Sequence, residues 1–283
     1  MCTRKSAHFS RVLVAVGIVV YATAAQGAGN WVRIDAGTFE MGANKGTDPL
    51  ANNDERPKRN VTLDDYEIGK NEVTVAQFAR FVAAGGYDSD GLWDRTAQGE
   101  ANRFGAWSEP HDWQAQLGHP NRPVTGVSWY EAMAFCKWQS AQVGRPITLP
   151  TEAQWERAAR GVAGRRFAWG NKIPDGSLNL NYNKNIGHTT DVGTHPDGNT
   201  PGTNISDLAG NAWEWCLDRK VSYRIAPRAG DGLRTGRSQY RAIRGGSFHH
   251  EGPKLRAACR SGAGPQVRID SVGFRLVRRS VAP

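Results

Sequence analysis

Residues 244–252 read RGGSFHHEG and set three side chains that could exchange protons or bind a metal next to one another, His249, His250 and Glu251. Glycine adopts backbone angles that other residues avoid, so the paired glycines could form a turn that aims the following side chains into a pocket. A positioned carboxylate or imidazole can accept a proton from a substrate. We predict a catalytic site in which Glu251 is the base and His250 positions the base or the substrate. His249, its neighbour in an expected extended segment, should point to the opposite side.

The same stretch also fits a solvated loop, because isolated clusters of polar residues lie mostly on protein surfaces. The choice between a site and a loop depends on the elements that hold the turn.

Three helices are marked by capping boxes, in which a Ser or Thr side chain and a Gln or Glu three residues later satisfy free backbone N–H groups reciprocally. The pairs are Thr74 with Gln77, Ser128 with Glu131, and Thr151 with Gln154. The glycines at positions 85, 144 and 161 are expected to end these helices.

Short strands are predicted at 31–34, 38–41, 60–63, 241–244 and 273–277. Residues 170–204 have almost no periodicity, and so long an irregular segment needs something to hold it, such as a cation bound by loop oxygens. The sequence shows no internal repeat and no linker. We therefore expect one α+β domain over residues 28–283, rich in loops, with short strands and a few helices.

Residues 1–27 have the features of a secretory signal peptide. Basic residues flank an apolar run at 12–21 that is short for a membrane span, and small residues then offer cleavage sites. An uncleaved anchor is the alternative. Cleavage would export the protein, to the periplasm in a bacterium, with no stable membrane span, and would lower its formal charge from +9 to +6. The remaining basic residues are scattered, which argues against nucleic-acid binding.

Three cysteines remain after removal of the signal, Cys136, Cys216 and Cys259. In an oxidising compartment they allow one disulfide and one leftover thiol, and spacing alone does not select the pair. Cys136 lies on the apolar side of the second helix, so we expect it to be a buried free thiol. No CxxC or Cys/His spacing typical of structural zinc is present.

The chain resembles the formylglycine-generating enzyme / sulfatase-modifying-factor family in nine segments that follow the family order. They are GTFEMG (37–42), ERP (55–57), NEVTVAQFARF (71–81), RPVTGVSWYEAMAFCKW (122–138), LPTEAQWERAARG (149–161), WGN (169–171), DLAGNAWEW (207–215), RGGSF (244–248) and GFRLV (273–277). The resemblance covers nearly all of residues 28–283. It implies the single α+β domain of that family, distantly similar to the C-type lectin fold.

The resemblance also implies structural Ca²⁺, which prefers carboxylate and carbonyl oxygens. The ligands that it implies are Asp207, the carbonyls of Gly210 and Ala212, and Glu214 for one ion, and Asn181, the Tyr182 carbonyl and Asn185 for a second. The alternative for the first set is a polar turn followed by buried tryptophans.

Trp213 and Ser247 match residues that line the family's pocket, and Arg260 follows in the next segment, so these three are candidate substrate-binding residues. A tryptophan could stack on a flat aromatic substrate. Trp213 also alternates with a second tryptophan as in a strand, which would instead bury one of them. The resemblance further suggests a Cys216–Cys259 disulfide, because the family loops that carry these segments approach the same pocket region.

The chain departs from the family's copper enzymes at the reactive turn. Members that form formylglycine carry two copper-binding cysteines there, whereas this chain has none from 245 to 258, and His250 takes the first cysteine's place. We therefore do not expect copper bound by a cysteine pair, and the redox cofactor stays unidentified. The ergothioneine-type sulfoxide synthases need a helical domain with a His-x3-His-x-Glu element, which this sequence lacks.

The layout is most similar to a third branch, the periplasmic pyoverdine-maturation proteins. We predict an exported oxidoreductase that acts on a small or peptide-derived substrate, namely a siderophore precursor, and oxidises dihydropyoverdine to the mature pyoverdine chromophore. Two alternatives are kept. One is a calcium-stabilised, non-catalytic binding module of the same fold, and the other is a formylglycine-generating sulfatase activator.

Overall fold

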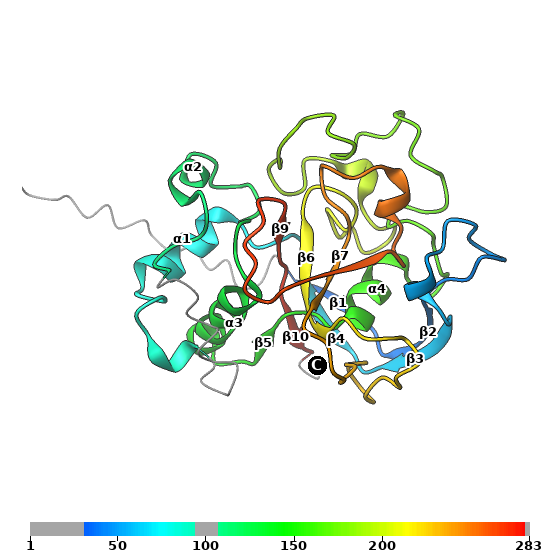
Figure 1. Cartoon of the computed structure of the whole chain (residues 1–283), viewed down its shortest axis with the longest axis horizontal. Coiled ribbons are helices and arrows are strands. Elements are labelled where there is room, and N and C mark those ends of the chain that lie inside the picture. Colours follow the sequence, from blue (N-terminus) through cyan, green and yellow to red (C-terminus); the bar gives the residue numbers. More distant parts are fainter. Residues whose placement is uncertain (1–30, 94–106, 281–283) are drawn as a thin grey trace, which may run out of the picture.

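This computed structural model describes residues 31–93 and 107–280, which contain two four-stranded sheets and one two-stranded sheet (Figure 1). The signal peptide predicted at 1–27 lies outside these residues. The first sheet has the order β1 (Trp31–Ile34), β4 (Tyr66–Gly69), β10 (Val277–Arg279), β5 (Ile147–Thr148). The two-stranded sheet pairs β2 (Gly37–Met41) with β3 (Arg59–Leu63). The third sheet has the order β8 (Arg260–Ala263), β7 (Arg241–Arg244), β6 (Trp213–Arg219), β9 (Val272–Gly273).

All three predicted helices are confirmed, each with both hydrogen bonds of its capping box. They are α1 (Val75–Ala83), α3 (Trp129–Val143) and α4 (Glu152–Arg160). A short helix, α2 (Trp113–Leu117), and four 3-10 turns complete the described helices, the turns being η1 (Asn53–Glu55), η2 (Asp90–Leu92), η4 (Pro196–Gly198) and η5 (Gly252–Leu255). Among the described residues, no helix is both long and apolar enough to cross a membrane.

The strand predictions are confirmed at the start of the chain and corrected at its end. Strands β1 and β7 have the predicted bounds, and β2 and β3 each begin one residue earlier. The strand expected at 273–277 is instead two strands, β9 and β10, which belong to different sheets. The chain crosses between the sheets here because Phe274 is buried in one core cluster and Val277 in another.

Side chains hold the irregular segment 170–204, whose helical content is the single turn η4. The Asn181 amide donates to the His188 carbonyl and to the Asn211 side chain, at 2.9 and 3.1 Å. The buried His195 ring lies within 2.9 Å of polar side chains on both of its nitrogens, Asn179 and Thr190. These contacts fix the long loops at the upper right of Figure 1.

Strand β6 separates two apolar clusters. Trp213 and Trp215 belong to the cluster with α1 and α3, whereas Cys216, the next residue, belongs to the cluster with α4. Cys259 belongs to the cluster with α1 and α3. The Cys216–Cys259 disulfide is therefore wrong: the two side chains lie in different clusters, and all three described cysteines are buried free thiols, as expected for Cys136.

Several arginines are buried against carboxylates. Arg275 and Glu214 are both fully buried, and the guanidinium donates to the two carboxylate oxygens at 2.6 and 2.7 Å. The remaining donors of Arg275 reach the carbonyls of Gly69, Lys70 and Ser206. The pair therefore joins the end of β4, the segment before β6 and β6 itself.

Replacing Arg275 with Met is expected to lower the free energy of unfolding by about 3–5 kcal/mol, because it leaves the Glu214 carboxylate buried without its partner. Urea denaturation measures this loss. The matched control is Arg228→Met, which breaks the exposed pair with Asp231 and should cost no more than about 1 kcal/mol. Equal losses of unfolding free energy in the two variants would show that the buried Arg275–Glu214 pair stabilises the protein no more than the exposed pair does.

Candidate functional site

A glycine pair at the end of β7 sets the backbone of the predicted reactive turn. Gly245 and Gly246 have φ values of +100° and +76°, which side chains other than glycine disfavour. A Cβ at Gly246 would lie 2.9 Å from Leu255 and 3.1 Å from the Lys254 carbonyl oxygen, and a Cβ at Gly245 would lie 3.2 Å from the Trp155 ring. The turn is thus fixed by close packing as well as by its backbone angles.

The turn brings His250, Ser247 and Trp213 together. The Ser247 hydroxyl lies 2.8 Å from Nδ1 of His250, and the imidazole meets the Trp213 ring edge to face at 5.3 Å between centroids. Trp213 packs against the imidazole and is only 5% exposed, so it offers little face for a flat substrate to stack on. The structure therefore favours a positioning role for Trp213 and Ser247.

The half-buried imidazole of His250 has a pKa below its usual value near 6.5. Burial is the main cause, because it disfavours the charged ring, and the positive charges of Lys254 and His249 add to it. A neutral imidazole that donates through Nδ1 to the Ser247 hydroxyl keeps a lone pair on Nε2, which has no partner among the described residues. This atom is therefore available to accept a proton near neutral pH.

His249 and Glu251 are exposed, and the described residues provide neither carboxylate nor imidazole with a hydrogen-bond partner. The His249 ring lies on Phe248 at 3.9 Å, away from the contacts of His250. The segment is a turn and not the extended strand that we predicted, because the backbone N–H of His250 donates to the Ser247 carbonyl. The contacts of His250, and not those of Glu251, are those of a positioned group.

Arg260 does not reach the turn. Its guanidinium donates to the Glu152 carboxylate and to the Val221 carbonyl, and it lies over the Tyr223 ring at 4.1 Å. With 4% exposure and its donors used within the protein, Arg260 is a structural residue, so we correct its assignment as a substrate-binding candidate.

The residues expected to bind calcium have mixed surroundings. Both Glu214 oxygens accept from Arg275, and one also accepts from the Trp155 ring. Asp207 is buried and accepts one hydrogen bond from the Gly193 N–H at 2.7 Å. The Asn185 side chain accepts from the Tyr182 N–H, and the Asn185 N–H donates to the Tyr182 carbonyl. Within 31–93 and 107–280, no group of three or more His, Cys, Asp and Glu side chains is arranged to hold a metal.

Unpartnered buried oxygens mark a neighbouring position. Oε1 of Glu72 and Oδ1 of Asn181 are buried with no hydrogen-bond partner, and both residues bond to the Asn211 side chain through their other atoms. Oδ1 of Asn71 is a third such atom, and it lies beside Gly193, the partner of Asp207. The sequence analysis did not single out Glu72, which precedes the Thr74 cap and belongs to no metal-ligand motif.

Burial raises the pKa of both carboxyl groups in this cluster. The pKa of Glu72 lies well above its usual value, first because the group is buried and then because Asp207 and Glu214 lie nearby. The pKa of Asp207 rises to about 6, again mainly through burial. The protein groups around this cluster thus leave its negative charge incompletely compensated.

The cysteines do not form a thiolate pair. Burial raises the pKa of the Cys259 thiol to about 11 and that of Cys216 well above its usual value. Burial also raises the pKa of Cys136. These thiols are therefore protonated and inert near neutral pH.

Comparison with known proteins gives one family over most of the chain. A sulfatase-modifying factor enzyme 1-like domain matches residues 19–280. The formylglycine-generating enzyme of Streptomyces coelicolor is 34% identical, over 86% of this chain and 87% of the relative. The hercynine oxygenase of Mycolicibacterium smegmatis is 30% identical, over 88% of this chain and 61% of the relative. The structure of PvdO from Pseudomonas aeruginosa superposes with a TM-score of 0.68 and 24% identity, over 88% of this chain and 94% of that one.

The His250 ring is expected to titrate below pH 6.5, and removing the Lys254 charge should raise its pKa. Histidine NMR signals followed through a pH titration of Lys254→Gln and of the parent measure both values. The control is Lys172→Gln, which removes an exposed charge beside Asp175. A His250 pKa at or above 6.5 in the parent would contradict the burial of this ring.

Proposed function

Because the chain belongs to the sulfatase-modifying factor enzyme 1-like family, we propose that it is an exported oxidoreductase that matures a peptide-derived metabolite. Membership of a family that includes formylglycine-generating enzymes and hercynine oxygenases supports an oxidative maturation enzyme in general. The observation that carries the proposal for this chain is the contact of His250 with Ser247 and Trp213, which positions one neutral base at the turn.

The specific substrate that we propose is dihydropyoverdine, whose reduced ring would be oxidised to the mature pyoverdine chromophore. Structural similarity to PvdO supports the fold on which this proposal rests. Oxidation of a dihydro ring to an aromatic ring removes two electrons and two protons. Dioxygen could accept both and become hydrogen peroxide, and a bound redox metal is the other acceptor to be tested. The chain's own part would be to hold the ring and to remove a proton.

His250 replaces Glu251 as the proton acceptor in this proposal. Ser247 would hold the ring through Nδ1 and Trp213 would fix its plane, and the tautomer protonated on Nδ1 leaves the Nε2 lone pair to face the substrate. Glu251, exposed at the start of η5, would lie at the edge of the site. A neutral imidazole is suited to this role because proton transfer is most efficient when the base has a pKa near the working pH.

A sulfatase activator that works through a copper–cysteine pair is less well supported than an oxidase of this kind. The relative of Streptomyces coelicolor shares 34% identity, but the turn of this chain carries no cysteine from 245 to 258. The non-catalytic binding module stays as the outcome that would follow if the turn proves inert.

Replacing His250 with Gln should lower turnover of dihydropyoverdine by about 10²–10⁴-fold, because the amide cannot accept the proton. Absorbance and mass spectrometry of the product measure the rate. Glu251→Gln is the matched control at the adjacent position and should keep activity within a few-fold of the parent. Parental turnover in the His250 variant, or a larger loss in Glu251→Gln, would reverse the roles given to the two residues.

The pH dependence gives a second readout of the same role. Because His250 must be neutral and its pKa is lowered, kcat/KM should rise with pH through a midpoint below about 6.5 and then level off. This limb should be absent from the residual activity of the His250 variant. A strain that lacks the gene for this protein should accumulate the reduced precursor. Failure to accumulate it would count against dihydropyoverdine as the substrate.

We further propose a structural Ca²⁺ among Glu72, Asn181 and Asp207. The support is the buried, unpartnered oxygens of Glu72 and Asn181, which a hard cation would satisfy, together with the buried carboxylate of Asp207. Asp207 and Asn181 come from the set that the resemblance implies, whereas Glu72 is added from its position. Glu214 is left outside the ligand set because Arg275 and Trp155 use its oxygens. Such an ion would join the segment before α1 to the irregular segment.

Chelation is expected to lower the melting temperature of the parent, and added Ca²⁺ should restore it. At a Ca²⁺ concentration one hundred times the dissociation constant, binding should add about 2.7 kcal/mol to the free energy of unfolding. Glu72→Gln should lose this response. In chelator it should melt no lower than the parent, because an amide has no charge to bury. Asp35→Asn, at an exposed carboxylate, is the control. An unchanged melting temperature on chelating the parent would refute the site.

A further inference from the structure

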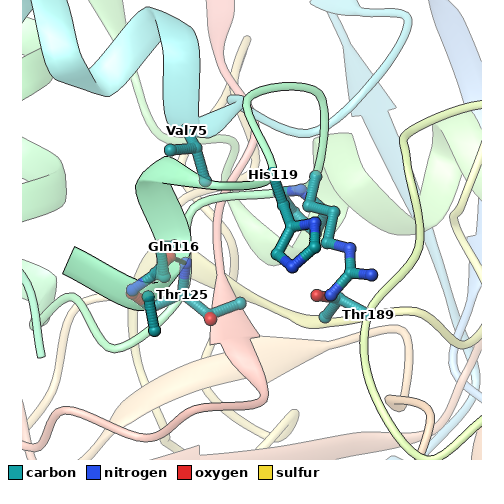
Figure 2. Close-up of a pocket in the computed structure, with 8 residues that line it drawn as sticks. Val75, Gln116, His119, Thr125 and Thr189 are labelled. Atoms are coloured by element: carbon teal, nitrogen blue, oxygen red, sulfur yellow. Dashed lines mark hydrogen bonds between the residues drawn. The ribbon is translucent and has the colours of Figure 1, made fainter. Parts of the chain in front are cut away.

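A pocket of about 240 Å³ lies between the N-terminal end of α1, the segment from α2 to residue 125, and the irregular segment. Gln116 and Thr125 line it across from His119 and Thr189, with Val75 beside them (Figure 2). The remaining lining residues are Ala115, Arg122 and Pro123. The pocket is smaller than the roughly 300–1,000 Å³ of drug-sized sites, so it fits one functional group with a short chain.

The free polar groups of this pocket are basic or hydroxyl-bearing. None of the described residues that line it is acidic, and Arg122 is always charged. The Gln116 amide is already used, since it donates to the His111 and Thr125 carbonyls and accepts from the Thr125 N–H. Arg122 is thus the permanent charge of the pocket, with the Thr125 and Thr189 hydroxyls as further possible donors.

Arg122 differs from the buried arginines that pair with carboxylates. The guanidinium groups of Arg244, Arg256 and Arg278, for example, each pair with a carboxylate. Arg122 is partly buried, and its guanidinium has no hydrogen bond or ion pair to any described residue. An unpaired guanidinium that lines a pocket without acids points to an anion as its missing partner.

The backbone around Arg122 is held from both sides. The N–H groups of Val75 and Ala76, at the start of α1, donate to the carbonyls of Arg122 and Pro120. From the irregular segment, the N–H of Val192 donates to the Asn121 carbonyl at 3.0 Å. The segment that carries the cation is therefore fixed before any ligand arrives, which limits the ordering cost of binding.

We propose that this pocket binds a carboxylate attached to a short apolar chain. Arg122 would hold the two carboxylate oxygens, with the Thr189 hydroxyl as an added donor, while Val75, Ala115 and Pro123 contact the chain. The group could belong to a free small acid or to the end of a peptide-derived molecule. The proposal does not depend on the oxidation chemistry at His250, since it concerns equilibrium binding alone.

Calorimetric titration of the purified full chain with butyrate, and with neutral butyramide, tests this site. Butyrate should bind and butyramide should bind at least tenfold more weakly. Arg122→Gln should weaken butyrate binding by at least tenfold, and Arg122→Lys by less, because it keeps the charge but loses the two-pronged contact. Arg224→Gln removes an exposed charge outside the pocket and should bind as the parent does.

An acetylated Gly-Ala peptide and its C-terminal amide distinguish the two sources of the carboxylate. Binding of the peptide acid in addition to butyrate, but not of the peptide amide, assigns a group carried on a larger molecule, and binding of butyrate without the peptide acid assigns a free small acid. Three results would overturn the proposal: no butyrate binding by the parent, equal binding of butyramide, or unchanged binding by an Arg122→Gln variant that melts like the parent. If the Arg122→Gln variant does not fold, butyrate binding by Arg122→Lys is measured instead, and binding as tight as that of the parent would overturn the proposal.

Discussion

The guanidinium of Arg275 meets both oxygens of Glu214 where neither side chain has contact with water. Removing two charges from water is costly, and their attraction repays this only when every remaining donor is also satisfied. Here the other donors reach the carbonyls of Gly69, Lys70 and Ser206. Glu72 closely follows Lys70 in the sequence, and Asp207 follows Ser206. Because Arg275 holds the carbonyls of Lys70 and Ser206, the ion pair also determines where the acidic cluster lies.

The reactive turn is tied to this cluster through Asn211. The Asn211 side chain contacts Glu72 and Asn181, and its carbonyl accepts the N–H of Phe248, next to the Ser247 that orients His250. The N–H of Gly210 likewise donates to the Gly245 carbonyl. The position of His250 therefore depends on how well the irregular segment is ordered, so the proposed ion and the proposed base are mechanically connected.

Sequence reasoning succeeded where the signal is local. Each capping box lies within four residues, and all three helices follow from them. Strand β6 was not among the predicted strands, although the alternation of its two tryptophans was noted; its first four residues are all buried, so that alternation does not separate an exposed side from a buried one. The wrong disulfide, the divided strand at 273–277 and the corrected Arg260 share one cause. Each depends on which side of a sheet a residue faces, and that is decided by distant packing.

For the candidate site, the sequence identified the turn but not the order of importance within it. The sequence favoured Glu251 as the base, and only the fold shows that His250 contacts Ser247 and Trp213 while Glu251 is exposed. Glu72 and Arg122 carried no motif of their own chemistry. Their significance comes from an unpartnered oxygen and an unpaired guanidinium, which are properties of the folded chain.

The close packing around Gly245 and Gly246 separates what shapes the turn from what reacts in it. The path of the backbone is fixed by the absence of side chains at these two positions, whereas the groups available for chemistry come afterwards. The side chains that follow the glycines can therefore be exchanged while the path of the backbone that presents them stays the same.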